Sequence, residues 1–269
     1  DQRIRGVKMK YQAVIFDWAG TMIDFGSFAP MGVFVEAFKQ FEIEISIAQA
    51  REPMGMPKWQ HIEAMFANPL IAQQWQERYG HAPNKAAIDQ VYDVFVPMNE
   101  AVVANYAELV PGALPMLQQL AQYRLKVGST TGYTRSIMEQ VIPVAAAQGY
   151  QPLNVVCADD LPFGRPTALG MYKCCLDLAV AHTSLLIKVD DTAPGIAEGV
   201  AAGCLTVGVA LSGNYVGKTP EELAALSAEQ VQALRKQATQ RLQAAGADYV
   251  IDTVADLPVL LEKLSAQHG

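Results

Sequence analysis

Polar side chains follow three of the short apolar segments of the chain, at the points where strands would end. Asp17 comes directly after the first segment, Thr131 after the second, and Asp190 and Asp191 after a later one. Ligands of an open parallel sheet bind beyond the carboxyl ends of its strands, so these side chains are expected to lie together. Mg²⁺ favours one or two carboxylates together with water and phosphate oxygens. The pattern predicts a metal-bound phosphoryl site.

Each of these residues also has a plain structural interpretation. An aspartate after a strand often caps a helix or a turn, Thr131 and Gly132 could form a capped turn, and Arg165 could be a solvated surface cation. A hydroxyl and free backbone N–H groups are nonetheless what a phosphate needs. A fixed cation is required near a phosphorylated carboxylate. We therefore interpret the combination as a phosphate site.

The order of the predicted elements indicates how these side chains are positioned. Short β-rich apolar segments alternate with helical patterns, which is typical of an α/β protein with a doubly wound parallel sheet. The predicted strands are residues 13–16, 125–128, 153–156, 185–189, 205–209 and 249–251. The predicted helices are residues 116–123, 135–146 and 167–179.

Residues 25–105 break this alternation, because they show helical periodicity and no convincing strand. Their apolar stripes consist of Val33, Phe34, Ala37, Phe38 and Phe41 and of Ile88, Val91, Tyr92 and Phe95. We predict a helical cap domain over residues 25–105, inserted into an α/β core domain of residues 1–24 and 106–269. Residues 219–246, rich in Glu, Gln and Ala, are expected to form surface helix without chemistry.

The composition of the chain narrows the class of partner. The 269 residues are 51% hydrophobic, enough for a large core, and carry a net charge of −7. This charge offers no basic surface for nucleic acid or for an anionic membrane. No apolar segment approaches the ~20 residues that span a bilayer, and the polar start at residues 1–5 does not resemble a signal peptide. We expect a cytoplasmic protein that acts on a small molecule.

These motifs resemble the four ordered motifs of the haloacid dehalogenase superfamily. They are the segment Asp17–Thr21, the strand-end Thr131, the basic Arg165 and the acidic pair Asp190-Asp191. The helical insertion after the first motif is similar to the first cap type of that superfamily. The resemblance implies a haloacid dehalogenase-like core in which Asp17 is the nucleophile.

An ordinary phosphatase of this superfamily needs a residue that is missing here. Such enzymes carry a second aspartate two positions after the nucleophile, where it protonates the leaving alcohol and then activates water. In this chain Ala19 stands at that position and cannot shuttle a proton. Either the leaving group needs no acid, or the acid comes from elsewhere.

A lysine of the predicted cap offers a different chemistry. Pro57 suits the first helical position, which puts Lys58 in the first turn. There the helix dipole and desolvation favour the neutral amine that attacks an aldehyde. His61, three residues on, lies on the same helix face as a proton carrier. On spacing alone, Lys58 could equally be a solvated lysine like Lys39 and Lys85, and His61 a partly buried helix residue.

Over nearly its whole length the sequence resembles the phosphonoacetaldehyde hydrolase family, also called phosphonatases. The resemblance rests on residues 17–21, 25–30, 50–61, 128–133, 164–166, 188–192 and 212–214. It implies that Lys58 forms a Schiff base with the aldehyde and that Asp17 takes the phosphoryl group. The electrons of the C–P bond then flow into an enamine. Because no leaving oxygen needs a proton, Ala19 is tolerated.

The same resemblance implies the remaining site residues, the cofactor and the assembly. The cofactor is Mg²⁺, the substrate a small phosphonate and the assembly a homodimer. The implied residues are Asp17, Lys58, His61 and Met54 for catalysis and its support, Thr131, Gly132, Tyr133 and Arg165 for the phosphoryl group, and Asp17, Ala19 and Asp191 for the metal.

The chain departs from the family pattern at two positions. Gly195 stands four residues after Asp191, where a second acid is common, and Asp190 could compensate through a water. Ser27 stands where some relatives carry a cysteine. Two other functions compete: a phosphatase or phosphomutase acting on a small phosphate ester, which Ala19 disfavours, and a non-catalytic relative that binds a phosphorylated ligand, which the retained site residues disfavour.

Overall fold

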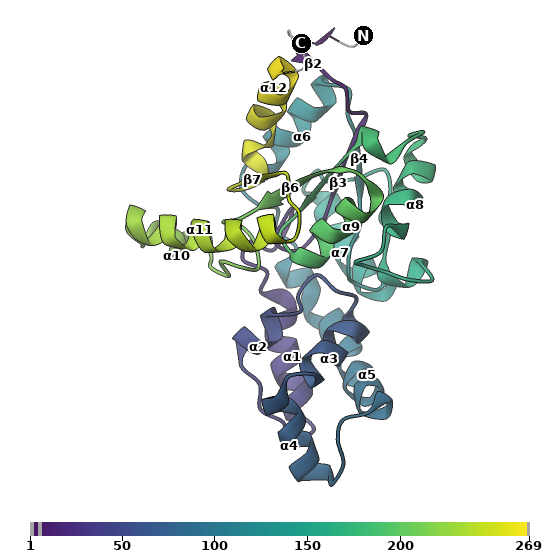
Figure 1. Cartoon of the computed structure of the whole chain (residues 1–269), viewed down its shortest axis with the longest axis vertical. Helices are drawn as coiled ribbons and strands as arrows, with labels where there is room; N and C mark the ends of the chain where they lie inside the picture. The colour runs from purple at the N-terminus through teal and green to yellow at the C-terminus, as the bar shows by residue number, and fades with distance from the viewer. Residues whose placement is uncertain (1–2, 5–6, 268–269) are drawn as a thin grey trace.

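The chain forms an α/β lobe and a helical lobe that meet along one side (Figure 1). The computed structural model describes residues 3–4 and 7–267. Residues 1, 2, 5 and 6, which include part of the polar start considered above, lie outside the described residues. Within the described residues, no helix has the length and apolar character needed to cross a membrane.

A parallel sheet forms the centre of the α/β lobe, with the strand order β4-β3-β5-β6-β7. Its strands are β3 (Ala13–Phe16), β4 (Lys126–Ser129), β5 (Leu186–Asp190), β6 (Leu205–Val209) and β7 (Tyr249–Ile251). Phe16 of β3 pairs with Ser129 of β4 and with Val189 of β5, so the three strands end at the same edge. A separate antiparallel pair consists of β1 (Arg3–Ile4) and β2 (Val7–Lys8).

Both faces of the sheet are covered by helices. Val14 and Phe16 of β3 belong to an apolar cluster with α6 (Ala113–Gln122), α7 (Arg135–Ala147) and α12 (Leu257–Gln267). Ala13 and Ile15 belong to a second cluster with α8 (Leu169–Leu178) and the end of α9 (Ala193–Ala202). Successive side chains of a strand point to opposite faces. This arrangement confirms the predicted doubly wound α/β fold.

The helical lobe lies between β3 and α6 in the sequence. It contains α1 (Ala29–Lys39), α2 (Ile47–Arg51), α3 (Lys58–Phe66), α4 (Pro69–Tyr79) and α5 (Lys85–Val102). The predicted apolar stripes face each other, and the rings of Phe34 and Phe95 stack with centroids 4.2 Å apart. Short 3₁₀ turns occur at η1 (Val103–Tyr106), η2 (Ala158–Asp160), η3 (Thr183–Leu185) and η4 (Val254–Asp256). The exact domain boundaries stay a prediction.

The strand predicted at residues 153–156 is wrong. The segment runs beside β4, and Ser129 O accepts from Val156 N at 3.0 Å, but the N–H of Ser129 donates to the side-chain Oδ1 of Asn154 at 3.0 Å and its hydroxyl to Asn154 O at 2.7 Å. A side chain therefore takes the place of a ladder partner. Leu153 N still donates to Val127 O at 2.8 Å, but the pairing amounts to one isolated bridge, between Thr130 and Val156, and not to a strand.

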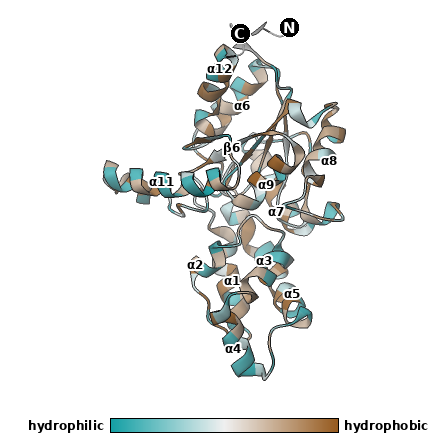
Figure 2. Cartoon of the chain, in the orientation of Figure 1, coloured by the Kyte–Doolittle hydropathy of each residue, from teal (hydrophilic) through white to brown (hydrophobic). Residues whose placement is uncertain are grey.

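Residues 219–246 contain two helices where one was expected. Helix α10 (Pro220–Ala224) ends early, and Ser227 caps a new helix, α11 (Ala228–Ala244), by accepting a hydrogen bond from Gln230 N at 3.1 Å. Figure 2 shows polar residues over most of α11, which extends away from the sheet. Its buried residues are Ala238 and Leu242.

Candidate active site

A small cavity lies where the helical lobe meets the strand ends of the sheet. It measures about 10 Å³ and is lined by Asp17, Ala19, Met54, Gly55, Lys58, Thr131, Gly132, Tyr133, Arg165 and Thr192. This volume holds about one water molecule, so the two lobes are closed on each other. All residues predicted for the site line this cavity except His61 and Asp191.

Asp17 directly follows β3, and the backbone fixes its position. Its N–H donates to Val189 O of the neighbouring strand at 3.0 Å, and its Oδ1 accepts a hydrogen bond from Arg165 at 2.9 Å. Burial raises the pKa of Asp17, but the charges of Arg165 and Lys188 outweigh burial and hold this pKa below its ordinary value. Asp17 is therefore ionised, which is the form that a nucleophilic carboxylate requires.

Three buried carboxylates converge beside the cavity. Ligand oxygens of Asp17, Asp190 and Asp191 lie within 4.8 Å of one another. The carboxylate of Asp191 accepts from Thr21 Oγ1 at 3.1 Å and from Asn214 N at 2.9 Å. Burial and the charges of Asp17 and Asp190 raise the pKa of Asp191 well above its ordinary value. Repulsion of this kind is relieved by a bound cation, and an all-oxygen donor set suits a hard divalent ion.

Asp190 fills the space that a side chain at position 195 would need. A Cβ atom added to Gly195 would lie 1.8 Å from Asp190 Oδ2, so a side chain at position 195 would displace the Asp190 carboxylate from its present place. Asp190 Oδ1 accepts from the N–H and the hydroxyl of Thr192, at 3.0 and 3.1 Å. Its Oδ2 lies 3.3 Å from Lys188 Nζ. The chain thus lacks the family's second acid at position 195, and the carboxylate of Asp190, at the end of β5, occupies that space.

Lys58 is the first residue of α3. The prediction that Pro57 occupies the first helical position is therefore wrong by one residue. Pro57 is the N-cap, with φ −54° and ψ 145°, because its backbone is still extended there. Lys58 remains in the first turn and is 2% exposed. Lys39 and Lys85 are exposed. The interpretation of Lys58 as a solvated lysine is therefore wrong.

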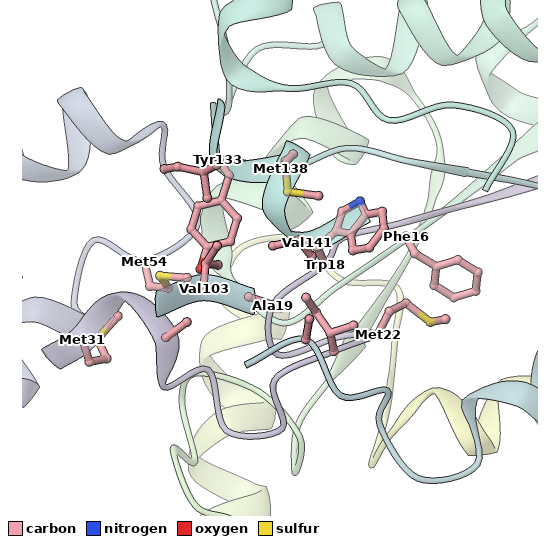
Figure 3. Packing of buried hydrophobic residues seen from close by; sticks show 14 of the residues in the cluster. Phe16, Trp18, Ala19, Met22, Met31, Met54, Val103, Tyr133, Met138 and Val141 are labelled. Carbon is pink, nitrogen blue, oxygen red and sulfur yellow. The ribbon is translucent and has the colours of Figure 1, made fainter. Parts of the chain in front are cut away.

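The surroundings of the Lys58 amine are apolar and aromatic. Its Nζ lies 3.6 Å from Met54 Sδ and 4.7 Å from the centroid of the Tyr133 ring. Figure 3 shows this ring directed toward the region between Met54 and Ala19. Burial lowers the pKa of Lys58 to about 7, although the charge of Asp17 favours the ammonium form. About half of the amine is then neutral at pH 7.

His61 lies one turn further along α3 and outside the cavity. The side chain is fully buried, its Nε2 lies 2.7 Å from Ala50 O, and its ring stacks on Phe34 at 4.2 Å. Among the described residues, Nδ1 has no hydrogen-bond partner. Burial and the charge of Lys58 lower the pKa of His61 well below its ordinary value. His61 is neutral, and its role as a proton carrier stays a prediction.

Arg165 connects the nucleophile with the helical lobe. It is 5% exposed, which excludes a solvated surface cation, and its NH1 donates to Gly55 O at 3.3 Å. Glycines allow the two lobes to approach here. Gly55 has φ +99°, and a Cβ atom on Gly132 would lie 2.8 Å from Met56 O. Arg165 can therefore contact the nucleophile and the closed helical lobe at once.

Comparison with known proteins agrees with this geometry. Residues 11–203 match the family model of the haloacid dehalogenase-like hydrolases. A phosphonoacetaldehyde hydrolase of Paraburkholderia phytofirmans is 50% identical over 256 residues, which cover 95% of this chain and 96% of the relative. The chain belongs to the phosphonoacetaldehyde hydrolase family.

Solved structures agree with membership of the phosphonoacetaldehyde hydrolase family. A phosphonoacetaldehyde hydrolase-like protein from Oleispira antarctica has a TM-score of 0.94 at 44% identity, over 97% of this chain and 95% of that one. A hydrolase from Pseudomonas syringae has a TM-score of 0.68 at 16% identity, over 94% and 99% of the two chains, and shares the fold alone. The predicted family is confirmed, and the roles of individual residues stay predictions.

Lys188 and Glu198, two charged residues of this member of the phosphonoacetaldehyde hydrolase family, were not predicted as site residues. Lys188 lies within β5, and Glu198 lies on the buried side of α9. Both side chains are within hydrogen-bond distance of Thr130. A signal exists in the sequence, since a lysine inside the apolar segment 185–189 must be paired if it is buried. Its partner, ten residues away on a helix, is set by the packing of α9 on the sheet.

Proposed function

We propose that the chain hydrolyses the C–P bond of phosphonoacetaldehyde, the substrate that its relatives are named for, to acetaldehyde and phosphate. The observation that carries the proposal is Lys58, a fully buried amine with a pKa of about 7 in the same cavity as the ionised Asp17. A neutral amine attacks an aldehyde and a carboxylate attacks phosphorus. Hydrolysis of a simple phosphate ester has no use for the amine.

The reaction proceeds in two covalent stages. Lys58 Nζ adds to the aldehyde carbon, and loss of water gives an iminium. Asp17 then attacks phosphorus, and the C–P bond electrons pass into an enamine. Arg165 and Thr131 hold the phosphoryl oxygens. Water hydrolyses the aspartyl phosphate. The enamine is protonated on carbon, and a second water releases acetaldehyde, so one water is consumed overall.

Ala19 fits this reaction better than ester hydrolysis. The departing group is a carbon that becomes an enamine, so no oxygen needs a proton from position 19. The side chain of Ala19 lines the cavity between Asp17 and the Lys58 region. The oxygen that Ala19 can offer to the site is that of its backbone carbonyl. Dimerisation, which the family resemblance implies, and a cytoplasmic location, which was expected from the composition and apolar pattern of the sequence, belong to the same proposal.

The proposal is tested by its products. The purified chain with phosphonoacetaldehyde and MgCl₂ is expected to release acetaldehyde and phosphate in equal amounts, measured by coupled alcohol dehydrogenase and by a phosphate assay. A panel of small sugar phosphates serves as the control. Turnover of the sugar phosphates without acetaldehyde release from the phosphonate would favour a phosphatase or phosphomutase. Binding without turnover would favour a non-catalytic relative.

The metal is proposed to be Mg²⁺, held by Asp17, the Ala19 carbonyl and Asp191. When bound, it supplies positive charge that stabilises the phosphoryl group. The fit rests on charge: four buried carboxylates, Asp17, Asp190, Asp191 and Glu198, are accompanied by the buried cations Arg165 and Lys188 and by Lys58, which is about half charged at pH 7, so a negative excess remains.

Removal of the Asp191 carboxylate is expected to affect the Mg²⁺ requirement more than removal of the Asp190 carboxylate. Asp191→Ala should raise the Mg²⁺ concentration for half-maximal activity by at least ~10-fold, the scale of losing a ligand or its support. Asp190→Ala should raise it less, because Asp190 is already engaged by Thr192 and Lys188. Activity is measured against MgCl₂ concentration after treatment with a chelator. The reverse order would show that Asp190 is the direct ligand.

A further inference from the structure

We propose that Lys188 and Glu198 are positioning residues that hold the guanidinium of Arg165 in the orientation needed for phosphoryl transfer. The inference rests on the proposed function, because it assigns Arg165 to the phosphoryl group. Neither residue lines the cavity, so they would act through Arg165 and not on the substrate.

The two residues and Thr130 form a closed, buried hydrogen-bond triangle. Lys188 Nζ lies 2.6 Å from Glu198 Oε1 and donates to Thr130 Oγ1, also at 2.6 Å. The hydroxyl of Thr130 in turn donates to Glu198 Oε1 at 2.7 Å. Lys188 is 0% exposed and Glu198 is 1% exposed. Each polar atom of the triangle thus has a defined partner and little freedom to rotate.

This triangle contacts one side of the Arg165 guanidinium. Arg165 NH2 donates to Thr130 O and to Thr130 Oγ1, both at 3.0 Å. Its Nε lies 3.5 Å from Glu198 Oε1, which is an ion-pair contact, and makes no hydrogen bond among the described residues. The same NH2 donates to Asp17 at 2.9 Å. A guanidinium is a rigid plane, so contacts at Nε and NH2 also direct NH1, which points to Gly55 O of the helical lobe.

The packing around the pair leaves space for these two side chains. A Cβ atom on Gly170 of α8 would lie 2.6 Å from Glu198 Oε2, and one on Gly199 of α9 would lie 2.8 Å from Lys188 Cβ. Larger residues at either glycine would displace the pair. A buried ion pair is often no more stabilising than apolar residues of the same size. A positioning role accounts for the pair better than a gain in stability does.

Loss of Glu198 changes the balance of charges around Arg165. The guanidinium also lies 3.4 Å from Asp190 Oδ2 and 2.9 Å from Asp17 Oδ1. Without the Glu198 carboxylate at Nε, attraction to Asp190 and Asp17 is unopposed, and the plane can tilt away from the phosphoryl position. Lys58 contacts Met54 and the Tyr133 ring. Arg165, whose charge acts on the pKa of Lys58, stays charged when Glu198 is replaced, so imine formation should change little.

The test compares phosphate binding with imine formation in Glu198→Gln, which keeps the shape and removes the charge. In the presence of MgCl₂, the dissociation constant of inorganic phosphate is expected to rise ~10-fold and kcat on phosphonoacetaldehyde to fall ~10- to 100-fold, the scale for losing a residue that orients a binding group. The adduct of Lys58 with acetaldehyde, trapped by borohydride and measured by intact mass, should form at the wild-type rate.

Two further variants separate positioning from stability. The double variant Lys188→Met/Glu198→Met removes both charges and leaves no unpaired ion; it should fold and show the same loss of phosphate affinity. Glu42→Gln makes the same kind of change as Glu198→Gln at an exposed ion pair with Arg78 of the helical lobe and should change none of the measured quantities.

Unchanged phosphate affinity in both Glu198→Gln and the double variant would overturn the inference. So would an equal loss of phosphate binding and of adduct formation, which indicates a general structural defect. Phosphate binding is measured without turnover of the phosphonate. Failure of the proposed function would instead be seen in the wild-type chain, as an absence of acetaldehyde release.

Discussion

Replacement of Lys58 by arginine lowers kcat on phosphonoacetaldehyde by at least ~10³-fold, the scale of losing a covalent catalyst. Arginine keeps the positive charge and nearly the length, but its guanidinium stays protonated and forms no imine. Burial lowers the pKa of Lys58 to about 7 and so makes part of the amine neutral. A guanidinium in the same place stays charged. Since Ala19 supplies no acid, the variant has no alternative route to C–P cleavage.

The measurement combines turnover with mass spectrometry. Wild-type protein treated with acetaldehyde and borohydride should gain one reduced adduct at Lys58, and Lys58→Arg should gain none. The matched controls, Lys39→Arg and Lys85→Arg, alter exposed lysines of the helical lobe and should behave as wild type. In the wild type the rate of adduct formation should rise with pH through about 7, because deprotonation of Lys58 creates the attacking amine. A Lys58→Arg enzyme with a tenth of the wild-type kcat, an effect of roughly 1.4 kcal/mol, would exclude the imine mechanism.

The strands of the core could be predicted because most of them are short apolar segments in the sequence. The segments 205–209 and 249–251 have the bounds of β6 and β7 as predicted, and 249–251 is bounded by Asp248 and Asp252. The segment 153–156 has the same appearance and forms no strand. There the side chain of Asn154 accepts the N–H of Ser129, which a regular strand would bind through its backbone.

The site is predictable to the extent that strand ends of a parallel sheet converge. Asp17, Thr131 and Arg165 were expected together on that ground and on the family resemblance, and they line one cavity. The burial of Lys58 could not be predicted from its spacing in α3, which looks the same for a solvated lysine. Burial arises from closure of the helical lobe, which depends on contacts such as Arg165 to Gly55 O.

The charged layer behind the cavity was harder to predict. Lys188 is visible as an anomaly in an apolar strand segment, yet its partners come from different elements: Thr130 after β4, Glu198 on α9 and Asp190 at the end of β5. Local periodicity contains no information on such pairing. It is set by the strand register and by the small residues that bring α8 and α9 close to the sheet.

The Asp17→Asn variant is expected to lose turnover by at least ~10³-fold while it still folds, because an amide oxygen is a poor nucleophile and a weaker metal ligand than a carboxylate. Folding should survive. The amide can still accept the hydrogen bond from Arg165, and the change removes one charge from three crowded carboxylates. In chelator-treated protein, Tm measured by calorimetry should change little, because the lost ion pair with Arg165 is offset by weaker repulsion from Asp190 and Asp191. Added MgCl₂ should raise Tm less in the variant than in the wild type.

The same variant separates the two covalent stages, because the imine forms before the carboxylate acts. Asp17→Asn treated with phosphonoacetaldehyde and borohydride should accumulate an adduct at Lys58 that retains the phosphonate, whereas the wild type loses phosphate first and traps the two-carbon fragment. Arg165→Ala is the comparison: it weakens phosphate binding and removes a hydrogen-bond donor to Asp17, but it keeps the Asp17 carboxylate. An Asp17→Asn enzyme that turns over near the wild-type rate, or whose adduct lacks phosphorus, would show that another group accepts the phosphoryl. The buried carboxylates Asp190 and Asp191 would then be the residues to change next, because each has a carboxylate oxygen within 4.8 Å of one of Asp17.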